Sequence, residues 1–270
     1  MSILTSQGTA LITGASSGIG AIYADRLARR GYDLMLVARN AERLNALATR
    51  LKRDTGRAVE VVVADLNDKA GLSRVESILR DDHRIRMLVN NAGIGAPIAL
   101  LDSDIDQLER MIDLNVTALT RLTYAALPGL LKQKGGSIIN IASVVGIAPE
   151  ILNGVYGGTK AFVIAFTLSL FREFSERGIR VQAVLPGATA TEFWDLAGTP
   201  LNAVPPEIVM KADDMVDAAL SGYDQGEVIT IPALPDIADW DAYEAAREKM
   251  IPKLSLRTPA ERYGLHALAQ

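Results

Sequence analysis

A glycine-rich segment at residues 14–20 lies between two short apolar runs, and this arrangement limits the possible folds more than any other feature. Residues 9–13 (TALIT) and 34–38 (LMLVA) lack the alternation of a strand with one wet face, so both predict strands buried on two faces. Residues 21–30 are predicted to form the helix between these two strands, and Gly31 ends that helix. A βαβ unit of this kind needs a sheet covered by helices on both faces.

The same alternation of strand and helix continues along the chain. Further strands are predicted at residues 59–64, 87–89, 137–141, 181–185 and 228–231. The pattern predicts an α/β fold, a Rossmann-type doubly wound, mostly parallel sheet of about seven strands. We expect one domain over residues 1–270, in which 188–222 are a mobile substrate-binding insertion and 233–270 a C-terminal extension.

Composition excludes several classes of function. The net charge of −4 gives no basic surface for nucleic acid, and it disfavours anionic membranes as well. The chain has no cysteine and only His83 and His266, which excludes disulfides and thiolate chemistry and argues against a metal site. No leader-like segment and no run of eighteen apolar residues occurs, so a cytoplasmic protein is predicted.

Polar and glycine residues follow nearly every predicted strand. In a doubly wound sheet, ligands bind beyond the carboxyl ends of the strands. The residues at those ends are Gly14 to Gly20, Arg39, Asp65, Asn90 to Gly93, Ser143, and Pro186 with Gly187. Their convergence predicts a ligand site along one edge of the sheet.

The glycine-rich segment has the spacing G-x-x-x-G-x-G between a strand and a helix. Glycines there let the backbone approach a pyrophosphate, while the helix N-terminus supplies N–H donors. The part from Gly14 to Gly18 also fits the G-x-S-x-G elbow of serine hydrolases, with Ser16 as nucleophile. That alternative needs a base, and only His266 follows in the expected order.

Tyr156 and Lys160 lie four residues apart and therefore on one face of a helix, with Ser143 thirteen residues before the tyrosine. A tyrosine that exchanges a proton near neutral pH needs its phenolate stabilised, and a neighbouring ammonium does this through space. Lowering the pKa by ~3 units requires roughly 4 kcal/mol. The alternative is a core aromatic beside a solvated lysine.

Taken together, these motifs resemble the short-chain dehydrogenase/reductase family over about residues 8–192. The resemblance rests on Thr13 to Gly20, Asn90-Asn91-Ala92-Gly93, Asn115, Ser143, Tyr156, Lys160 and Pro186-Gly187. It implies that Tyr156 is the general acid or base, that Lys160 lowers its pKa and holds the nicotinamide ribose, and that Ser143 binds the substrate carbonyl. It further implies that Asn115 holds a water linking Lys160 to solvent. Gly157 and Gly158 depart from the residues usual between that Tyr and Lys.

The resemblance also implies a set of cofactor contacts. Asp65 and Leu66 would contact the adenine, and Thr189 and Thr191 would help to hold the nicotinamide carboxamide. The full set expected to bind cofactor is Gly14, Ser16, Ser17, Gly18, Ile19, Gly20, Arg39, Asp65, Leu66, Asn91, Ala92, Gly93, Tyr156, Lys160, Pro186, Gly187, Thr189 and Thr191.

Arg39 predicts which cofactor is used. At the end of the second strand an acid binds the adenosine ribose hydroxyls, whereas an arginine accommodates a 2′-phosphate. No acid follows that strand before Glu42, so NADP(H) is expected. Arg43 is either a second charge for the phosphate or a solvated helix residue.

The sequence therefore predicts an NADP(H)-dependent oxidoreductase that transfers a hydride between nicotinamide and a carbonyl or secondary alcohol. The expected substrate pocket is mainly apolar, with Glu150 and Glu192 as its polar candidates; its apolar members are Ile94, Val144, Val145, Pro149, Ile151, Leu152, Phe193, Trp194 and Leu196. The alternatives are a serine hydrolase based on Ser16 and a non-catalytic nucleotide-binding module.

The helix that carries Tyr156 continues through residues 161–171 with little polar face. Such a helix needs cover on two sides, and the family resemblance implies pairing of this helix and its predecessor across a two-fold axis. We therefore expect a homodimer or homotetramer. The alternative is a monomer whose C-terminal extension folds over that face.

Overall fold

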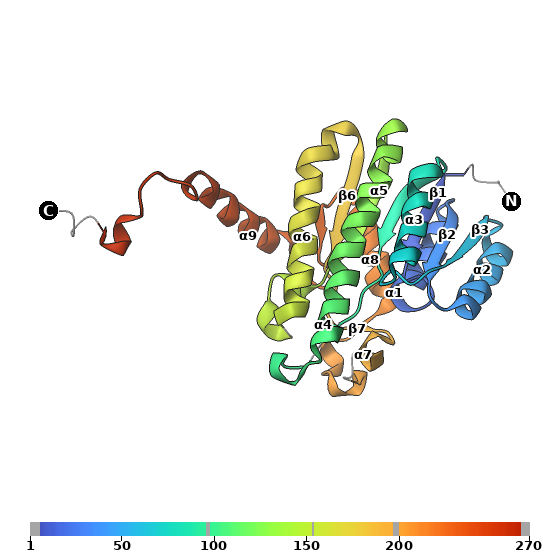
Figure 1. The fold of residues 1–270 in the computed structure, drawn as a ribbon, viewed down its shortest axis with the longest axis horizontal. Helices are drawn as coiled ribbons and strands as arrows, with labels where there is room; N and C mark the ends of the chain where they lie inside the picture. Colours follow the sequence, from blue (N-terminus) through green and yellow to red (C-terminus); the bar gives the residue numbers. More distant parts are fainter. Residues whose placement is uncertain (1–5, 96–97, 153, 197–199, 266–270) are drawn as a thin grey trace. The chain divides into compact units, whose positions relative to one another are not determined.

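Seven parallel strands form the central sheet of the computed structural model, which describes residues 6–95, 98–152, 154–196 and 200–265 (Figure 1). Their order across the sheet is β3-β2-β1-β4-β5-β6-β9. The strands are β1 (Thr9–Thr13), β2 (Asp33–Ala38), β3 (Val59–Val63), β4 (Ile85–Asn90), β5 (Gly136–Ile141), β6 (Ile179–Val184) and β9 (Ile229–Thr230). The predicted α/β fold is confirmed, and the order reverses between β1 and β4, where such sheets bind ligands.

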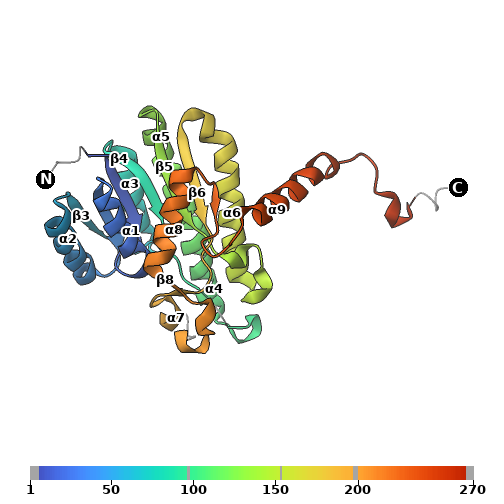
Figure 2. The ribbon, with the colours of Figure 1, turned by 180° about the vertical axis from the view of Figure 1, so that it is seen from behind.

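Helices cover both faces of this sheet. One face carries α1 (Gly18–Arg29), α2 (Ala41–Thr55) and α8 (Ala212–Gln225), whose apolar residues share a core with β1 and β2. The other face carries α3 (Lys69–Asp81), α5 (Leu119–Lys132) and α6 (Gly154–Phe174). Figure 1 views the sheet from the side of α5 and α6, and Figure 2 from the side of α1 and α8.

Smaller elements gather at the carboxyl end of the sheet, where α4 and α7 lie below the strands in Figure 1. They are α4 (Ile105–Ile112), a π-helix (Asp113–Ala118) that continues it into α5, α7 (Phe193–Leu196), and the parallel pair β7 (Thr189–Ala190) and β8 (Met210–Lys211). These elements therefore surround the edge where the sequence places the ligand site.

The predicted C-terminal boundary of the insertion at residues 188–222 lies too far along the chain. Residues 212–222 belong to α8, whose Met215, Val216 and Ala219 are completely buried against the sheet. Proline residues loosen the sequence pattern only up to residue 206, and the helix after them has the apolar spacing of a core helix. The segment between the sheet strands and α8 is therefore residues 188–211, and its mobility stays a prediction.

The helix α6 is long and apolar enough by length and composition to cross a membrane. In this fold it is a core helix instead, because Val163, Thr167 and Leu170 are buried and Leu170 packs in the core of the α3–α5 face. This burial accounts for one apolar side of the helix, whereas Phe162 and Phe171 on another side are exposed.

The chain divides into two compact units, Met1–Pro232 and Ala233–Gln270. The second begins where the sequence analysis places the extension. It contains α9 (Ile237–Met250), in which Trp240 is buried and lies 5.2 Å from the ring of Tyr243. Residues 251–265 follow with two short 3₁₀ turns and are exposed.

Candidate active site

The glycine-rich turn needs glycine for two separate reasons. Gly14 and Gly18 have φ of 65° and 51°, in the left-handed region that other residues rarely adopt. Gly20 has ordinary φ, but a methyl group there would lie 2.4 Å from the carbonyl oxygen of Gly14. These glycines bring the first turn of α1 against the end of β1.

The N-terminus of α1 is free to bind an anion. Its N-cap, Ser17, makes no side-chain capping bond among the described residues, and the first turn holds no acidic residue. The first N–H groups of a helix have no partner within the helix. Uncapped donors, together with the helix dipole, form a phosphate-binding site.

Asn91 and Thr13 fix the shape of this turn. The Asn91 side chain donates to the carbonyl oxygens of Thr13 (2.8 Å) and Gly14 (3.2 Å). In return, the Thr13 hydroxyl accepts from the N–H groups of Asn91 and Ala92, each at 3.0 Å. The Asn91 amide thus joins the ends of β1 and β4, and Thr13, to which the motif assigned no role, is a positioning residue.

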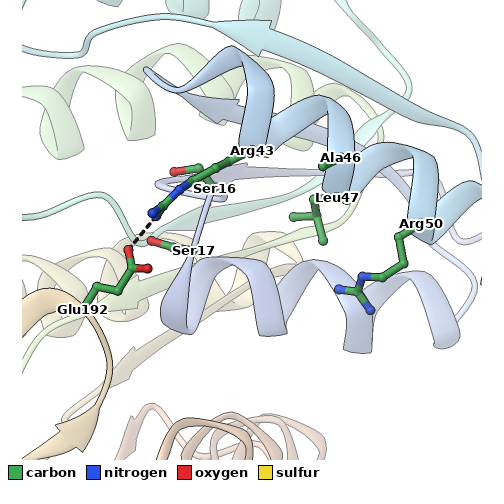
Figure 3. A pocket seen from close by; sticks show the side chains of 7 residues that line it. All are labelled: Ser16, Ser17, Arg43, Ala46, Leu47, Arg50 and Glu192. Carbon is green, nitrogen blue, oxygen red and sulfur yellow. Dashed lines mark hydrogen bonds and ion pairs between the residues drawn. The ribbon is translucent and has the colours of Figure 1, made fainter.

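Two arginines follow β2 and differ in whether they form an ion pair with the described residues. Arg39 is exposed and forms no hydrogen bond or ion pair with the described residues. Arg43, in the first turn of α2, pairs instead with Glu192 at 2.5 Å between Nη1 and Oε2. Figure 3 shows this pair beside Ser16 and Ser17, at a shallow pocket of about 430 Å³ that also includes Leu47. The structure thus brings Glu192 to the glycine-rich turn.

Asp65 follows β3 and is exposed. Its carboxylate accepts from the Asn67 N–H at 2.9 Å, the hydrogen bond of an ordinary Asx turn. Leu66 beside it is buried in the core. The local turn therefore explains in part why an aspartate occupies position 65.

Ser143, Tyr156 and Lys160 come together beyond β5. Ser143 caps the 3₁₀ turn Val144–Gly146 and donates to the Pro186 carbonyl oxygen at 3.3 Å, while Tyr156 and Lys160 lie on α6. The Lys160 ammonium lies 5.7 Å from the centre of the Tyr156 ring and donates to the Ile141 carbonyl oxygen at 2.9 Å. The side chains predicted to be catalytic therefore form one cluster.

Burial dominates the electrostatics of this cluster. It lowers the pKa of Lys160 to about 8, because an ammonium without water is disfavoured. Burial also raises the pKa of Tyr156, and a hydrogen bond with Ser143 opposes this in part. Lys160 is not among the causes of this shift, so the expected lowering of the Tyr156 pKa by Lys160 is not seen, and desolvation of the phenolate sets its direction.

Asn115 lies in the π-helix, a conformation often found at functional sites. Its Oδ1 accepts from the Ile94 N–H at 3.0 Å, and its Nδ2 donates to the Ile94 carbonyl and the Thr159 hydroxyl. The side chain thus positions the loop after β4, and its water-holding role stays a prediction. Thr159, which also donates to the Tyr156 carbonyl at 2.8 Å, is a further positioning residue that the motifs did not single out.

Gly93 leaves space beside these groups. A methyl group on it would lie 3.1 Å from Asn115 Oδ1 and 3.6 Å from Lys160 Nζ. A larger residue would occupy the space in front of the ammonium.

The segment after β6 lies across the glycine-rich turn. The Thr189 hydroxyl donates to the Gly187 carbonyl at 3.1 Å, and a methyl group on Gly18 would contact Thr191 at 3.3 Å. Pro186 accepts from the Val144 N–H at 3.0 Å, which ties this segment to the end of β5.

An apolar cluster surrounds the Tyr156 ring. It confirms an apolar setting and adds two residues of α4, Leu108 and Met111, to those that the sequence suggested: Ile94, Val145, Leu152 and Phe193. Pro149 packs instead on Gly157, where a methyl group would lie 2.9 Å from its Cβ, so this glycine allows close approach. Ile151 is 60% exposed, and the Leu196 side chain lies outside the described residues.

The hydrolase alternative finds no histidine near Ser16 within the described residues to serve as its base. His83 precedes β4, at the opposite edge of the sheet from Ser16. His266 lies outside the residues that the structure describes.

Comparison with known proteins decides the family. Residues 8–200 match the model of the short chain dehydrogenases, which is more than half of the chain. The chain belongs to the short-chain dehydrogenase family. It is therefore an oxidoreductase by family, and the resemblance found in the motifs is confirmed.

Two solved structures of dehydrogenases are similar to this protein over nearly the whole chain. One, from Sphingobium yanoikuyae in complex with NADPH, has 50% identity and a TM-score of 0.92, covering 95% of this chain and 99% of that one. The other is a bulky-bulky ketone specific alcohol dehydrogenase from Comamonas testosteroni, with 43% identity and a TM-score of 0.88 over 96% and 99% of the two chains.

Among curated relatives, a serine 3-dehydrogenase from Agrobacterium fabrum is 40% identical over 194 residues. The match covers 69% of this chain and 74% of the relative.

Proposed function

We propose that this short-chain dehydrogenase is an NADP(H)-dependent reductase of ketones with apolar substituents. The observation that carries the proposal is that a buried phenol, a serine hydroxyl and a buried ammonium share one edge of the sheet with a helix N-terminus that is uncapped, and an arginine that is unpaired, among the described residues. A non-catalytic binding module would have no need of a buried phenol beside a serine hydroxyl.

The described residues fit a phosphorylated dinucleotide. The free N–H groups at Gly18 to Gly20 would hold the pyrophosphate, and Arg39 would hold the 2′-phosphate. The bare α-carbon of Gly93 leaves space facing Lys160, which suits a ribose. The NADPH complex of the Sphingobium yanoikuyae relative supports this assignment. Bound there, the cofactor would supply the hydride.

The chain's own residues would handle the proton. Because burial raises the pKa of Tyr156, the phenol keeps its proton at neutral pH, which is the state needed to protonate the oxygen of a ketone undergoing reduction. Ser143 would donate a second hydrogen bond to that oxygen as negative charge develops. Lys160, with a pKa near 8, would remain mostly charged at pH 7 and stabilise the phenolate left behind.

The setting of Tyr156 favours an apolar substrate. The ring is only 6% exposed and is surrounded by aliphatic and aromatic side chains from the loop after β4, α4, the turn after β5 and α7. Burying apolar substituents there is favourable, whereas a charged substituent would lose its hydration. The 43% identity with the bulky-bulky ketone specific enzyme of Comamonas testosteroni supports the same class.

Reduction of a ketone panel with NADPH tests this proposal. We expect loss of absorbance at the nicotinamide band with aryl ketones, and little loss with charged oxo acids. Cofactor binding without turnover across the panel would favour the non-catalytic module, and ester cleavage without cofactor would favour the hydrolase.

We also propose association through α5 and α6. Tyr124 on α5 is 77% exposed, and Phe162 and Phe171 on α6 are partly exposed, with Phe162 stacked on Phe166 at 5.6 Å. These helices lie on the same face of the sheet (Figure 1). Light scattering at micromolar concentration should show a dimer or tetramer, and Tyr124→Asp with Phe171→Asp should reduce it to a monomer. A monomeric wild-type protein would contradict this assignment.

A further inference from the structure

The Phe193 ring covers the reactive tyrosine. Its centroid lies 6.1 Å from that of Tyr156, with the ring planes tilted by 40°, and both belong to the apolar cluster with Val145. Phe193 is half-buried, so its ring lies at the boundary between this cluster and solvent. A ketone oxygen must come within about 3 Å of the Tyr156 hydroxyl to take its proton, so whatever covers the ring limits the shape of the substrate.

Gly95 provides the surface on which Phe193 rests. Its φ is outside the left-handed region, so the backbone alone does not require glycine there. A methyl group on Gly95 would instead meet the Phe193 ring, at 2.3 Å from Cζ, 3.0 Å from Cε2 and 3.1 Å from Cε1. The three nearest atoms all belong to that ring, so the missing side chain is a space that Phe193 fills.

The other side of Phe193 is held within its own segment. The Trp194 ring meets it edge-on, with centroids 5.8 Å apart at 90°, and Trp194 Nε1 donates to the Thr189 carbonyl at 2.9 Å. The Phe193 N–H donates to the Thr191 hydroxyl at 3.3 Å. If the ring turned outwards, its contacts with Gly95 and the Tyr156 cluster would be lost and its contact with Trp194 would change, whereas these two hydrogen bonds do not involve the ring.

We infer that Phe193 determines substrate size by closing on Gly95. A ketone with one small substituent reacts beneath the closed ring, whereas a ketone with two large substituents displaces the ring from Gly95 and takes its place beside Tyr156. Gly95 is then a specificity residue because it allows the ring to close. The inference rests on the proposed ketone reductase activity.

The experiment compares Gly95→Ala, Phe193→Ala and the double variant, with kcat/KM for acetone and benzophenone in the presence of NADPH. Each single variant should change the ratio of the two kcat/KM values by at least about tenfold in favour of benzophenone. A change of this size is typical when an apolar subsite is filled or emptied. Gly95→Ala should add less than about twofold in the Phe193→Ala background, since the three atoms nearest to the added methyl group are gone. Gly154→Ala is the control, because a methyl group there has no atom within 4 Å.

An unchanged ratio in both single variants would overturn the inference. So would an effect of Gly95→Ala that is as large without the Phe193 ring as with it.

A second readout separates this inference from the proposed activity. In a Trp240→Phe background Trp194 is the only tryptophan, so its emission reports the neighbouring Phe193 ring without any turnover. Gly95→Ala should increase quenching of Trp194 by acrylamide, and Gly154→Ala should not. Unchanged quenching overturns the closing of Phe193 on Gly95, whereas a wild-type protein that reduces no ketone overturns the proposed activity.

Discussion

The two halves of the sheet's carboxyl edge differ in how far their functional side chains are exposed to solvent. On the side of β1 to β3, Arg39 and Arg43 are exposed. On the side of β4 to β6, Tyr156 and Lys160 are buried and their pKa values are shifted by desolvation. An exposed charge can attract and hold an anion at little cost in stability, whereas a proton donor needs a dry site that sets its protonation state. We therefore assign cofactor selection to the first half and chemistry to the second.

Removing the phenol should have the largest effect. Tyr156→Phe keeps the ring and its contact with Phe193 but removes the transferable proton, so kcat should fall by ~10²- to 10⁴-fold. Thermal unfolding should shift by only a few degrees and serves as the control. Turnover within about threefold of wild type would contradict the role of Tyr156 and the division between the two halves.

Arg39→Asp tests the opposite half. The unmodified enzyme should prefer NADPH over NADH by ~10- to 150-fold in kcat/KM, which corresponds to about 1.4 to 3 kcal/mol. The aspartate should reverse the preference, because it repels the 2′-phosphate and accepts from the free ribose hydroxyls. Arg257→Asp, in the second unit, changes the net charge by the same amount and should leave the preference for NADPH over NADH unchanged. An equal or better kcat/KM with NADH in the wild type would remove Arg39 from the site.

Lys160→Met tests whether the buried ammonium opposes folding. Its pKa in the folded state is about 8 against 10.5 when exposed, so below pH 8 both states are protonated and the folded state bears the full unfavourable effect. The depression corresponds to about 3 kcal/mol. The variant should be inactive yet more stable to urea at pH 7, by up to that amount. The difference should shrink as the pH rises from 8 to 10.5, and a variant less stable at pH 7 would contradict the assignment.

Glu192→Gln should have the smallest effect. The pair with Arg43 joins two side chains that are each about half exposed, and such pairs contribute little. Freeing Arg43 beside Ser16 and Ser17 should tighten NADPH binding by less than about fivefold and leave NADH binding unchanged. Glu42→Gln, on the same helix as Arg43, is the matched control. Weaker binding of both cofactors would indicate that Glu192 supports the turn structurally.

The sequence predicted the functional residues at the strand ends better than the long-range contacts between side chains around them. The turn at Gly14 to Gly20 and the cluster of Ser143, Tyr156 and Lys160 follow from local patterns, because glycine spacing and helical periodicity are visible within a few residues. The pair of Arg43 and Glu192 spans 149 positions, so no local pattern could show it. The same holds for Leu108 and Met111, which reach the Tyr156 ring only through the packing of α4.

The pKa of Tyr156 shows a second limit of sequence reasoning. The spacing of Tyr156 and Lys160 places two groups on one helix face, but the sign of the pKa shift depends on how much water reaches each group. Burial of both side chains decides it, and burial results from the whole fold. The boundary of α8 was misplaced for a related reason, since prolines up to residue 206 obscured the core spacing that follows.

Titration of NADPH into Tyr156→Phe tests the separation of the two halves most directly, with fluorescence of the bound nicotinamide as the signal. The Kd should stay within about threefold of the wild-type value, although ketone reduction is lost, because an aromatic ring remains at position 156 and the groups assigned to binding are intact. A Kd weakened by more than about tenfold would mean that Tyr156 serves cofactor binding as much as chemistry, and it would contradict the assignment of cofactor selection and chemistry to different halves of the edge.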